Sequence, residues 1–163
     1  MRAVYERLRT RKPPIASIIK MPKAPETNQT HFVAPGLTDL LVEVASLKQD
    51  PGNANHHPKD QIISLRASLR RVGQRTPLVF RSDDRTVLKG NGTLEAIIAE
   101  GWTHCAAVEV DDDPHTATGY SIADNQIGRL SSFDPEILKQ KLQEWNTGGG
   151  ASAIVGFNDS ELK

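Results

Sequence analysis

Apolar residues follow two different spacings along the chain, and each spacing predicts one kind of element. Ile62, Leu65, Leu69 and Val72 recur every three or four residues, which predicts an amphipathic helix over about 59–72. Short apolar or alternating runs predict strands at about 40–44, 77–80, 86–88 and 106–110. Helices and strands therefore interleave, which is typical of an α/β (α+β) domain with a small mixed β-sheet flanked by helices.

Glycine, aspartate and proline mark where these elements begin and end. Gly73 follows the 59–72 helix at the position that commonly takes a left-handed conformation. The polar segment 82–85 separates two predicted strands, so it predicts a hairpin. An N-cap aspartate followed by proline occurs twice and predicts helices over about 114–127, after Asp113, and 135–145, after Asp134.

A glycine turn at 90–92 is the most informative local pattern. The strand-like pair Val87-Leu88 precedes it, and helical spacing begins directly after Gly92. Such a unit points unpaired backbone N–H groups and the positive end of a helix at one spot, which predicts a phosphate site. Asn91-Gly92 is also a favoured hairpin turn, but the period of the residues that follow favours helix entry.

Charge is balanced overall but unevenly distributed. The chain has 20 Lys and Arg and 20 Asp and Glu, so no global field attracts it to nucleic acid or anionic lipid. Residues 1–37 form a basic, proline-containing arm. The alternatives for it are contact with the domain, with a partner or with nucleic acid, and a mobile tail. The domain is expected over 38–146, followed by a glycine-rich flexible tail over 147–163.

Cysteine usage and hydropathy predict the compartment. Cys105 has no cysteine with which to form an internal disulfide, which fits a reducing environment. No apolar run approaches the roughly 20 residues that a membrane span requires, so no membrane partner is expected. The sequence therefore predicts a cytoplasmic protein.

Four segments in order, from Val42 to about Glu144, resemble the N-terminal domain of the ParB/sulfiredoxin superfamily, often labelled ParB-like nuclease. They are Val42-Glu43-Val44-Ala45-Ser46-Leu47 with Asp50-Pro51-Gly52-Asn53; Leu65-x-x-Ser68-Leu69 with Gly73-Gln74 and Pro77-Leu78-Val79; Gly90-Asn91-Gly92-Thr93-Leu94-Glu95-Ala96; and Asp124-Asn125 with Arg129 and Asp134-Pro135-Glu136. Partition proteins continue into a helix-turn-helix domain, for which the residues after Trp145 leave no room. A short stand-alone version, of the type found on phages and mobile elements, is therefore expected.

The resemblance implies a nucleotide site and assigns residues to it. Phosphate would bind at Gly90, Asn91, Gly92 and Thr93, while Asn125 and Arg129 would complete the polyphosphate site. Asp124 would hold Mg²⁺ through oxygen, the ligand that this ion prefers. Gln74 and Asn53 would frame the nucleoside. The expected function is nucleotide binding, with Mg²⁺-dependent phosphoryl transfer or NTP hydrolysis as the candidate reactions.

Several roles have competing interpretations. Glu95 could orient Mg²⁺ or an attacking water as a catalytic residue, or it could simply face solvent. His56 could contact phosphate or act as a base, or it could be an ordinary loop histidine. Thr93 could cap the helix instead of binding phosphate. The alternative functions are a DNA-associated regulatory module that uses the basic arm, and a nuclease.

Overall fold

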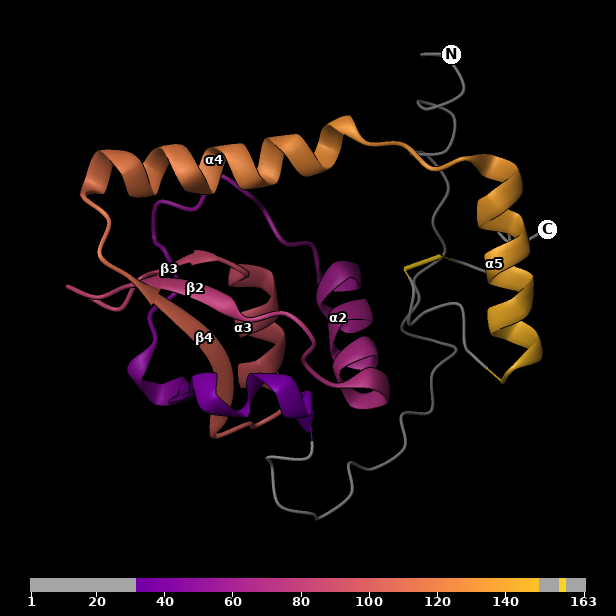
Figure 1. Cartoon of the computed structure of the whole chain (residues 1–163), viewed down its shortest axis with the longest axis horizontal. Coiled ribbons are helices and arrows are strands. Elements are labelled where there is room, and N and C mark those ends of the chain that lie inside the picture. Colours follow the sequence, from indigo (N-terminus) through magenta and orange to yellow (C-terminus); the bar gives the residue numbers. More distant parts are fainter. Residues whose placement is uncertain (1–31, 150–155, 158–163) are drawn as a thin grey trace.

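The computed structural model describes residues 32–149 and 156–157. Most of the predicted arm (1–31) and most of the predicted tail (150–155 and 158–163) lie outside the described residues. Within the described part the elements follow the order strand, helix, two strands, helix, strand and two helices, with two short 3₁₀ helices near the start. Figure 1 shows the helices over 59–72, 91–99 and 114–130 arranged around the strands.

The described strands form one mixed sheet, as the sequence predicts. They are β1 (Leu41–Glu43), β2 (Leu78–Arg81), β3 (Val87–Lys89) and β4 (His104–Val110), in the spatial order β1-β4-β2-β3. β1 pairs antiparallel with β4, β2 pairs antiparallel with β3, and β2 pairs parallel with β4. The β2–β3 hairpin turns through 82–85, which confirms that prediction.

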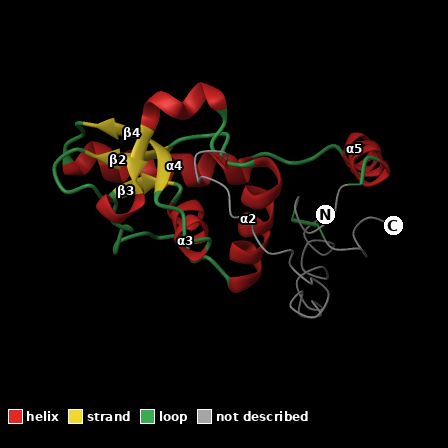
Figure 2. Cartoon of the chain, turned by 90° about the horizontal axis from the view of Figure 1, so that it is seen from below, coloured by secondary structure: helices red, strands yellow, loops and turns green. Residues whose placement is uncertain are grey.

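The helices begin and end close to the predicted residues. They are η3 (Pro35–Leu40), η4 (Val44–Ser46), α2 (Lys59–Val72), α3 (Asn91–Ala99), α4 (Pro114–Leu130) and α5 (Pro135–Thr147). Asp113 and Asp134 accept hydrogen bonds from the first backbone N–H groups of α4 and α5, so both predicted N-caps are confirmed. Figures 1 and 2 agree that α5 lies apart from the sheet. No helix in the described ranges is long and apolar enough to cross a membrane.

The core lies between the sheet and the α2–α3 pair. Leu78, Phe80, Val87, Leu94 and Ile97 have 2% or less of their surface exposed. α2 and α3 contact each other, and α4 contacts β3. Because α4 packs on β3, one long face of α4 lies opposite the 50–55 loop and the β2–β3 hairpin.

The first residues of the described chain are part of this core. Val33 is 5% exposed and forms a parallel bridge with Gln74, and the ring of Phe32 stacks against Trp102 at 5.2 Å between centroids. The sequence assigned these residues to the arm that ends at 37. Phe32 and Val33 pack against the domain, in agreement with the alternative in which the arm contacts it, because an apolar pair next to the end of α2 can be buried there.

Candidate functional site

A cleft of about 670 Å³ lies between α4, the 50–55 loop and the β2–β3 hairpin. α4 contributes one continuous face, since the lining positions recur every three or four residues. These positions are Pro114, Ala117, Thr118, Ser121, Ile122, Asn125, Gln126 and Arg129. The hairpin contributes Arg81, Asp84, Thr86 and Leu88. The cleft therefore joins segments that are far apart in the sequence.

Local hydrogen bonds fix the shape of the 50–55 loop. The Asn53 side-chain oxygen accepts a hydrogen bond from the Asn55 N–H at 3.1 Å, and the Asp50 carboxylate accepts one from the Gly52 N–H at 2.8 Å. Both are turns in which a short side chain bonds to the backbone two residues later. The Asp50 N–H donates to the Asn91 side chain at 2.9 Å, which ties the loop to the glycine turn. Asn53 and Asn55 are thus held at the cleft wall.

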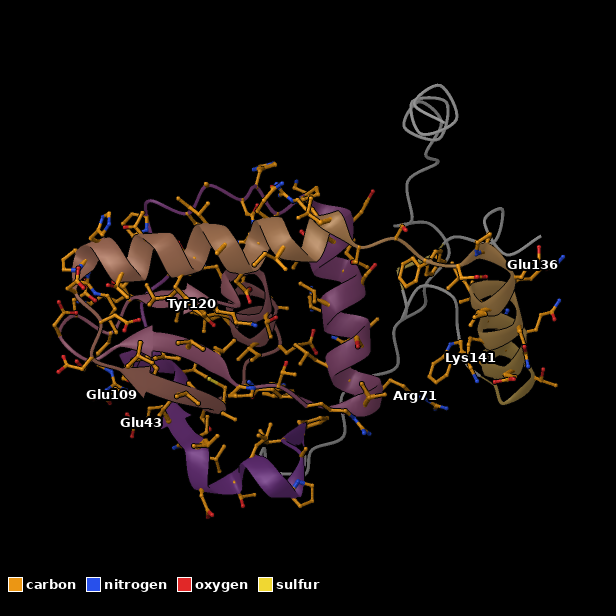
Figure 3. All side chains as sticks on the ribbon, turned by 45° about the horizontal axis from the view of Figure 1, so that its top comes forward. Glu43, Arg71, Glu109, Tyr120, Glu136 and Lys141 are labelled. Carbon is orange, nitrogen blue, oxygen red and sulfur yellow. The ribbon has the colours of Figure 1, made fainter. Side chains whose placement is uncertain are left out.

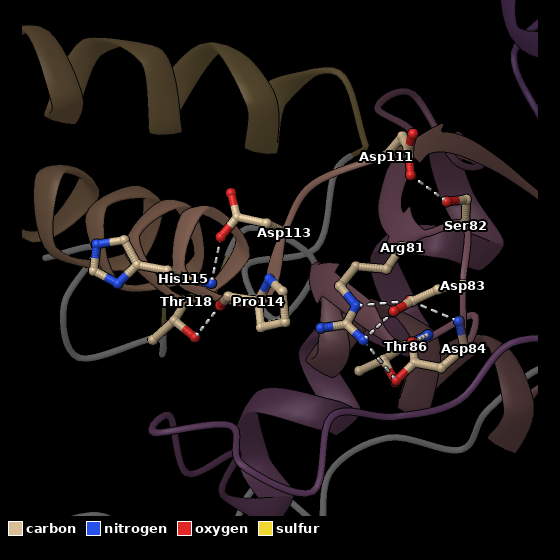
Figure 4. Close-up of polar contacts among 10 residues, drawn as sticks. All are labelled: Arg81, Ser82, Asp83, Asp84, Thr86, Asp111, Asp113, Pro114, His115 and Thr118. Carbon is tan, nitrogen blue, oxygen red and sulfur yellow. Dashed lines mark hydrogen bonds and ion pairs between the residues drawn. The ribbon is translucent and has the colours of Figure 1, made fainter.

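The two ends of the cleft differ in charge. At one end, Nη2 of Arg129 donates to the neutral Asn55 side chain at 2.5 Å, and Arg129 has no ion pair with any described residue. At the other end, the Arg81 guanidinium pairs with Asp83 at 2.7 Å and with Asp84 at 3.2 Å (Figure 4). Carboxylates therefore neutralise Arg81, whereas Arg129 keeps its positive charge.

The glycine turn has the predicted backbone. Gly90 takes φ +91° immediately before α3, and a Cβ there would lie 2.5 Å from Leu78 Cδ2, so only glycine fits. The N-cap of α3 is Gly90, without a side-chain cap, so the capping alternative for Thr93 is wrong. Helix entry, rather than the hairpin alternative, is confirmed.

The turn does not line the cleft, however. Asn91 is 8% exposed, and its side chain donates to the Val87 carbonyl at 2.8 Å while accepting from the Asp50 N–H. A Cβ on Gly92 would lie 2.8 Å from Nδ1 of His57, so that imidazole covers the turn. Asn91 and Gly92 therefore face side chains of the protein itself, which leaves no open phosphate cradle at this point.

His57, and not His56, is the histidine that contacts the 50–55 loop, α2 and the glycine turn. Its ring nitrogens lie 3.3 Å from the Asn53 amide nitrogen and 3.1 Å from the Gln61 side-chain oxygen. His56 is exposed and is not among the residues that line the cleft. The sequence held a usable signal, because His57 is four residues from both Asn53 and Gln61.

Asp124 lies on α4 and is already paired with Lys89. Nζ of Lys89, the last residue of β3, donates to its carboxylate at 2.6 Å. This hydrogen bond raises the pKa of Lys89 against the opposing effect of burial. No group of three or more His, Cys, Asp or Glu side chains that could hold a metal occurs among the described residues. One carboxylate bonded to an ammonium group is a poor donor set for a resident Mg²⁺.

Two further predicted site residues lie outside the cleft. Gln74 is 2% exposed, and its amide nitrogen donates to the Ala106 carbonyl at 2.8 Å while its oxygen accepts from the Ala106 N–H at 2.7 Å. The Gln74 amide therefore links the segment before β2 to strand β4. Its nitrogen and its oxygen are both used in these hydrogen bonds, so it is unavailable to frame a nucleoside. Glu95 is exposed on α3 and does not line the cleft, in agreement with its solvent-facing alternative.

Comparison with known proteins adds the fold type. No family model matches the chain, and no curated protein matches it. Among solved structures, the chain is similar to the C-terminally truncated chromosome-partitioning protein ParB from Caulobacter crescentus complexed with CTP-gamma-S, with TM-score 0.61, 15% identity and coverage of 75% of this chain and 73% of that chain. The chain has a ParB-like fold. A Pnob8-like ParB-N domain also matches, with TM-score 0.43, 19% identity and coverage of 61% and 40%.

Within this ParB-like fold, the cysteine is a core residue. Cys105 lies on β4 with its surface fully buried. Burial raises the pKa of its thiol to about 11, so the thiol is protonated at neutral pH. Thiolate chemistry at Cys105 is therefore no part of the site.

Proposed function

We propose that the cleft between α4 and the 50–55 loop binds a nucleotide, with the phosphates at the Arg129 end. One observation carries this proposal: Asn53 of the early loop and Asn125 and Arg129 of the later element line the same cleft. The resemblance predicted nucleotide roles for these three residues from separate parts of the sequence. The cleft, rather than the glycine turn, is the place where they meet.

The size and lining of the cleft suit such a ligand. About 670 Å³ lies within the usual range of 300–1,000 Å³ for small-molecule sites. Polar side chains line it, from Asn53, Asn55, Thr118, Ser121, Asn125 and Gln126. The Thr118 and Ser121 hydroxyls donate to backbone carbonyls of α4, so they are placed to accept hydrogen bonds from a base or a sugar. Arg129 supplies a guanidinium whose planar fork matches phosphate oxygens.

The orientation follows from the charges at the two ends. A phosphate group needs a cation that is not already neutralised, and Arg129 meets this requirement better than Arg81. Asp50 and Asp84 also line the cleft, and their carboxylates repel phosphate while accepting hydrogen bonds from hydroxyl or amino groups. We therefore place the nucleoside toward the hairpin and the phosphates toward the end of α4.

The ParB-like fold supports a nucleotide as the ligand class. The solved ParB structure with TM-score 0.61 is a complex with CTP-gamma-S, so one protein of this fold holds a nucleoside triphosphate analogue. Mg²⁺ dependence stays a prediction of the resemblance. Since Asp124 is bonded to Lys89, no step of the proposed function uses a metal, and the proposal is binding rather than turnover.

Calorimetric titration with CTP, ATP, GTP and their diphosphates, each with Mg²⁺ and with EDTA, tests the proposal. We expect saturable binding of at least one nucleotide, with binding retained in EDTA because the protein's own side chains make the contacts. If none of the nucleotides produces heat at millimolar concentration under either condition, the proposal fails.

A further inference from the structure

We infer that neutral His57 holds the 50–55 wall of the cleft in place, and that protonation of this imidazole releases the wall and weakens nucleotide binding. This role rests on the proposed nucleotide site, whose regulation by pH it adds. His57 is half-buried where the 50–55 loop, the start of α2 and the glycine turn meet. Asn53 lines the cleft and His57 does not, so His57 is a positioning residue that acts through Asn53.

The hydrogen bonds of His57 require one particular neutral form of its ring. The Asn53 amide nitrogen lies 3.3 Å from Nε2, and since an amide nitrogen only donates, Nε2 has to accept. The Gln61 side-chain oxygen lies 3.1 Å from Nδ1, and since an amide oxygen only accepts, Nδ1 has to carry the proton. Both bonds are therefore made together only by neutral histidine with its proton on Nδ1.

The Asn53 amide cannot turn over to suit a protonated ring. Its oxygen accepts a hydrogen bond from the Asn55 N–H at 3.1 Å, which directs its nitrogen toward His57. A protonated imidazole carries N–H groups on both nitrogens, so a donor would face a donor at Nε2. If the amide rotated by half a turn, its nitrogen would face the Asn55 N–H instead. Protonation therefore breaks either the contact with His57 or the turn that shapes the wall.

The glycine turn also disfavours a positive charge on this ring. A Cβ on Gly92 would lie 2.8 Å from Nδ1 of His57, so the imidazole rests on the first turn of α3. The backbone N–H groups at the start of a helix carry a partial positive charge, which repels a cation. Protonation therefore weakens the contact of His57 with α3 as well as its contact with Asn53.

Within the described part of the chain, no charged side chain on these segments pairs with His57. The titratable groups there are Asp50 in the loop, the neighbouring His56, Lys59 and Asp60 in the first turn of α2, and Glu95 on α3. The Asp50 carboxylate accepts from the Gly52 N–H instead. Arg129 of α4 donates to Asn55 and adds a further positive charge at this wall. The described surroundings thus hold no carboxylate partner that would retain an imidazolium in this position.

One end of the wall depends on the His57 contact. Figures 1 and 3 show the segment that leads into α2 running alongside α4 before it enters α2. At the start of the loop, the Asp50 N–H is bonded to the Asn91 side chain of α3. Further along, among the described residues, side-chain hydrogen bonds join the loop to other elements through His57, which bonds to α2, and through Arg129 of α4. Loss of the His57 contact therefore frees Asn53, which the proposed site uses.

Nucleotide titrations at several pH values test this role of His57. Histidine ordinarily changes its charge between about pH 5 and pH 8, and the ring that holds the wall is neutral, so affinity should fall as the pH falls. The loss between about pH 7.5 and about pH 5.5 should be about 3-fold to 10-fold, the contribution of one hydrogen bond. His57→Gln cannot titrate, so its affinity should change less with pH by this factor. Protonation of the nucleotide phosphates is common to both proteins and cancels in the comparison.

The matched control is His56→Gln, which removes an exposed neighbouring histidine that does not line the cleft. It should keep the pH dependence of the wild type. NMR of the free wild-type protein gives a reading that needs neither nucleotide nor variant. At neutral pH the ring ¹⁵N signals of His57 should show the proton on Nδ1, and on acidification the Asn53 side-chain amide signals should shift together with the His57 ring.

Three results would overturn the inference. They are a neutral ring with its proton on Nε2, Asn53 amide signals that do not follow the His57 titration, and a pH dependence of affinity that is equal in the wild type and in His57→Gln. Absence of nucleotide binding at every pH would instead overturn the proposed function, and the NMR signals would still decide whether neutral His57 holds the wall.

Discussion

Arg129 carries the electrostatic part of the proposed nucleotide site. Its partner is neutral Asn55, so replacement removes a charge that no described carboxylate balances. We expect Arg129→Gln to weaken triphosphate binding about 10-fold or more, because hydrogen bonds to charged groups contribute about 1.5–3 kcal/mol. Calorimetry should show little change for the corresponding nucleoside, which has no phosphate to lose.

The conservative variant Arg129→Lys separates charge from shape. A lysine keeps the positive charge but not the planar fork, so its affinity for triphosphate should fall between those of the wild type and Arg129→Gln. If Arg129→Gln weakened the nucleoside and the triphosphate equally, Arg129 would not be at the phosphate end.

The ion pairs of Glu100 with Arg66 and Arg70 lead to a prediction about the free energy of unfolding. Removing the charge of Glu100 leaves Arg66 and Arg70 without their shared partner, so Glu100→Gln should lower the free energy of unfolding by about 3 kcal/mol. The pKa of Glu100 is lower in the folded chain than its ordinary value of 4.5. Stability from its charge is therefore complete above that value and is lost as the pH falls through the folded pKa.

Urea denaturation of the wild type and Glu100→Gln measures this effect. The difference between them should be largest near neutral pH and should shrink below about pH 4.5. Glu136→Gln, at an exposed position on α5, is the control and should change stability little. A difference that did not depend on pH would mean that the charge of Glu100 is not what stabilises the α2–α3 contact.

At the scale of elements, local pattern was sufficient for most of the fold. The 59–72 helix, the caps at Asp113 and Asp134, and the entry into α3 after Gly90 follow from spacing and backbone chemistry within a few residues. The side chain that packs on the glycine turn could not be predicted from the local sequence. The cover of the turn is His57, which is distant in the sequence, and only tertiary packing brings that ring onto Gly92.

A double-mutant cycle tests this cover. Gly92→Ala should destabilise the protein by about 1–3 kcal/mol, because the new methyl group overlaps the His57 ring. In a His57→Ala background the same substitution should cost much less, since the space is then open. Thermal or urea unfolding of the four proteins gives the coupling free energy, and additive effects would show that His57 does not lie on the turn.

At the scale of the whole molecule, the sheet order explains why the cleft forms where it does. β3 lies at the edge of the sheet, α4 follows β4 back across the domain to contact β3, and the 50–55 loop is tied to the turn after β3 through Asn91. Sequence reasoning named Asn53, Asn125 and Arg129 separately. It missed Thr118 and Ser121, because the sequence does not show which face of α4 lies opposite the 50–55 loop.

An NMR titration of ¹⁵N-labelled protein with the nucleotide that binds best shows where on the protein the ligand lies. The side-chain amides of Asn53, Asn55, Asn125 and Gln126 line the cleft, whereas the backbone amides of 90–93 do not. We predict that the side-chain amide signals shift in a saturable way while the Gly92 amide moves little. Shifts centred on 90–93, with the cleft amides unchanged, would locate the nucleotide at the glycine turn and overturn the proposed site.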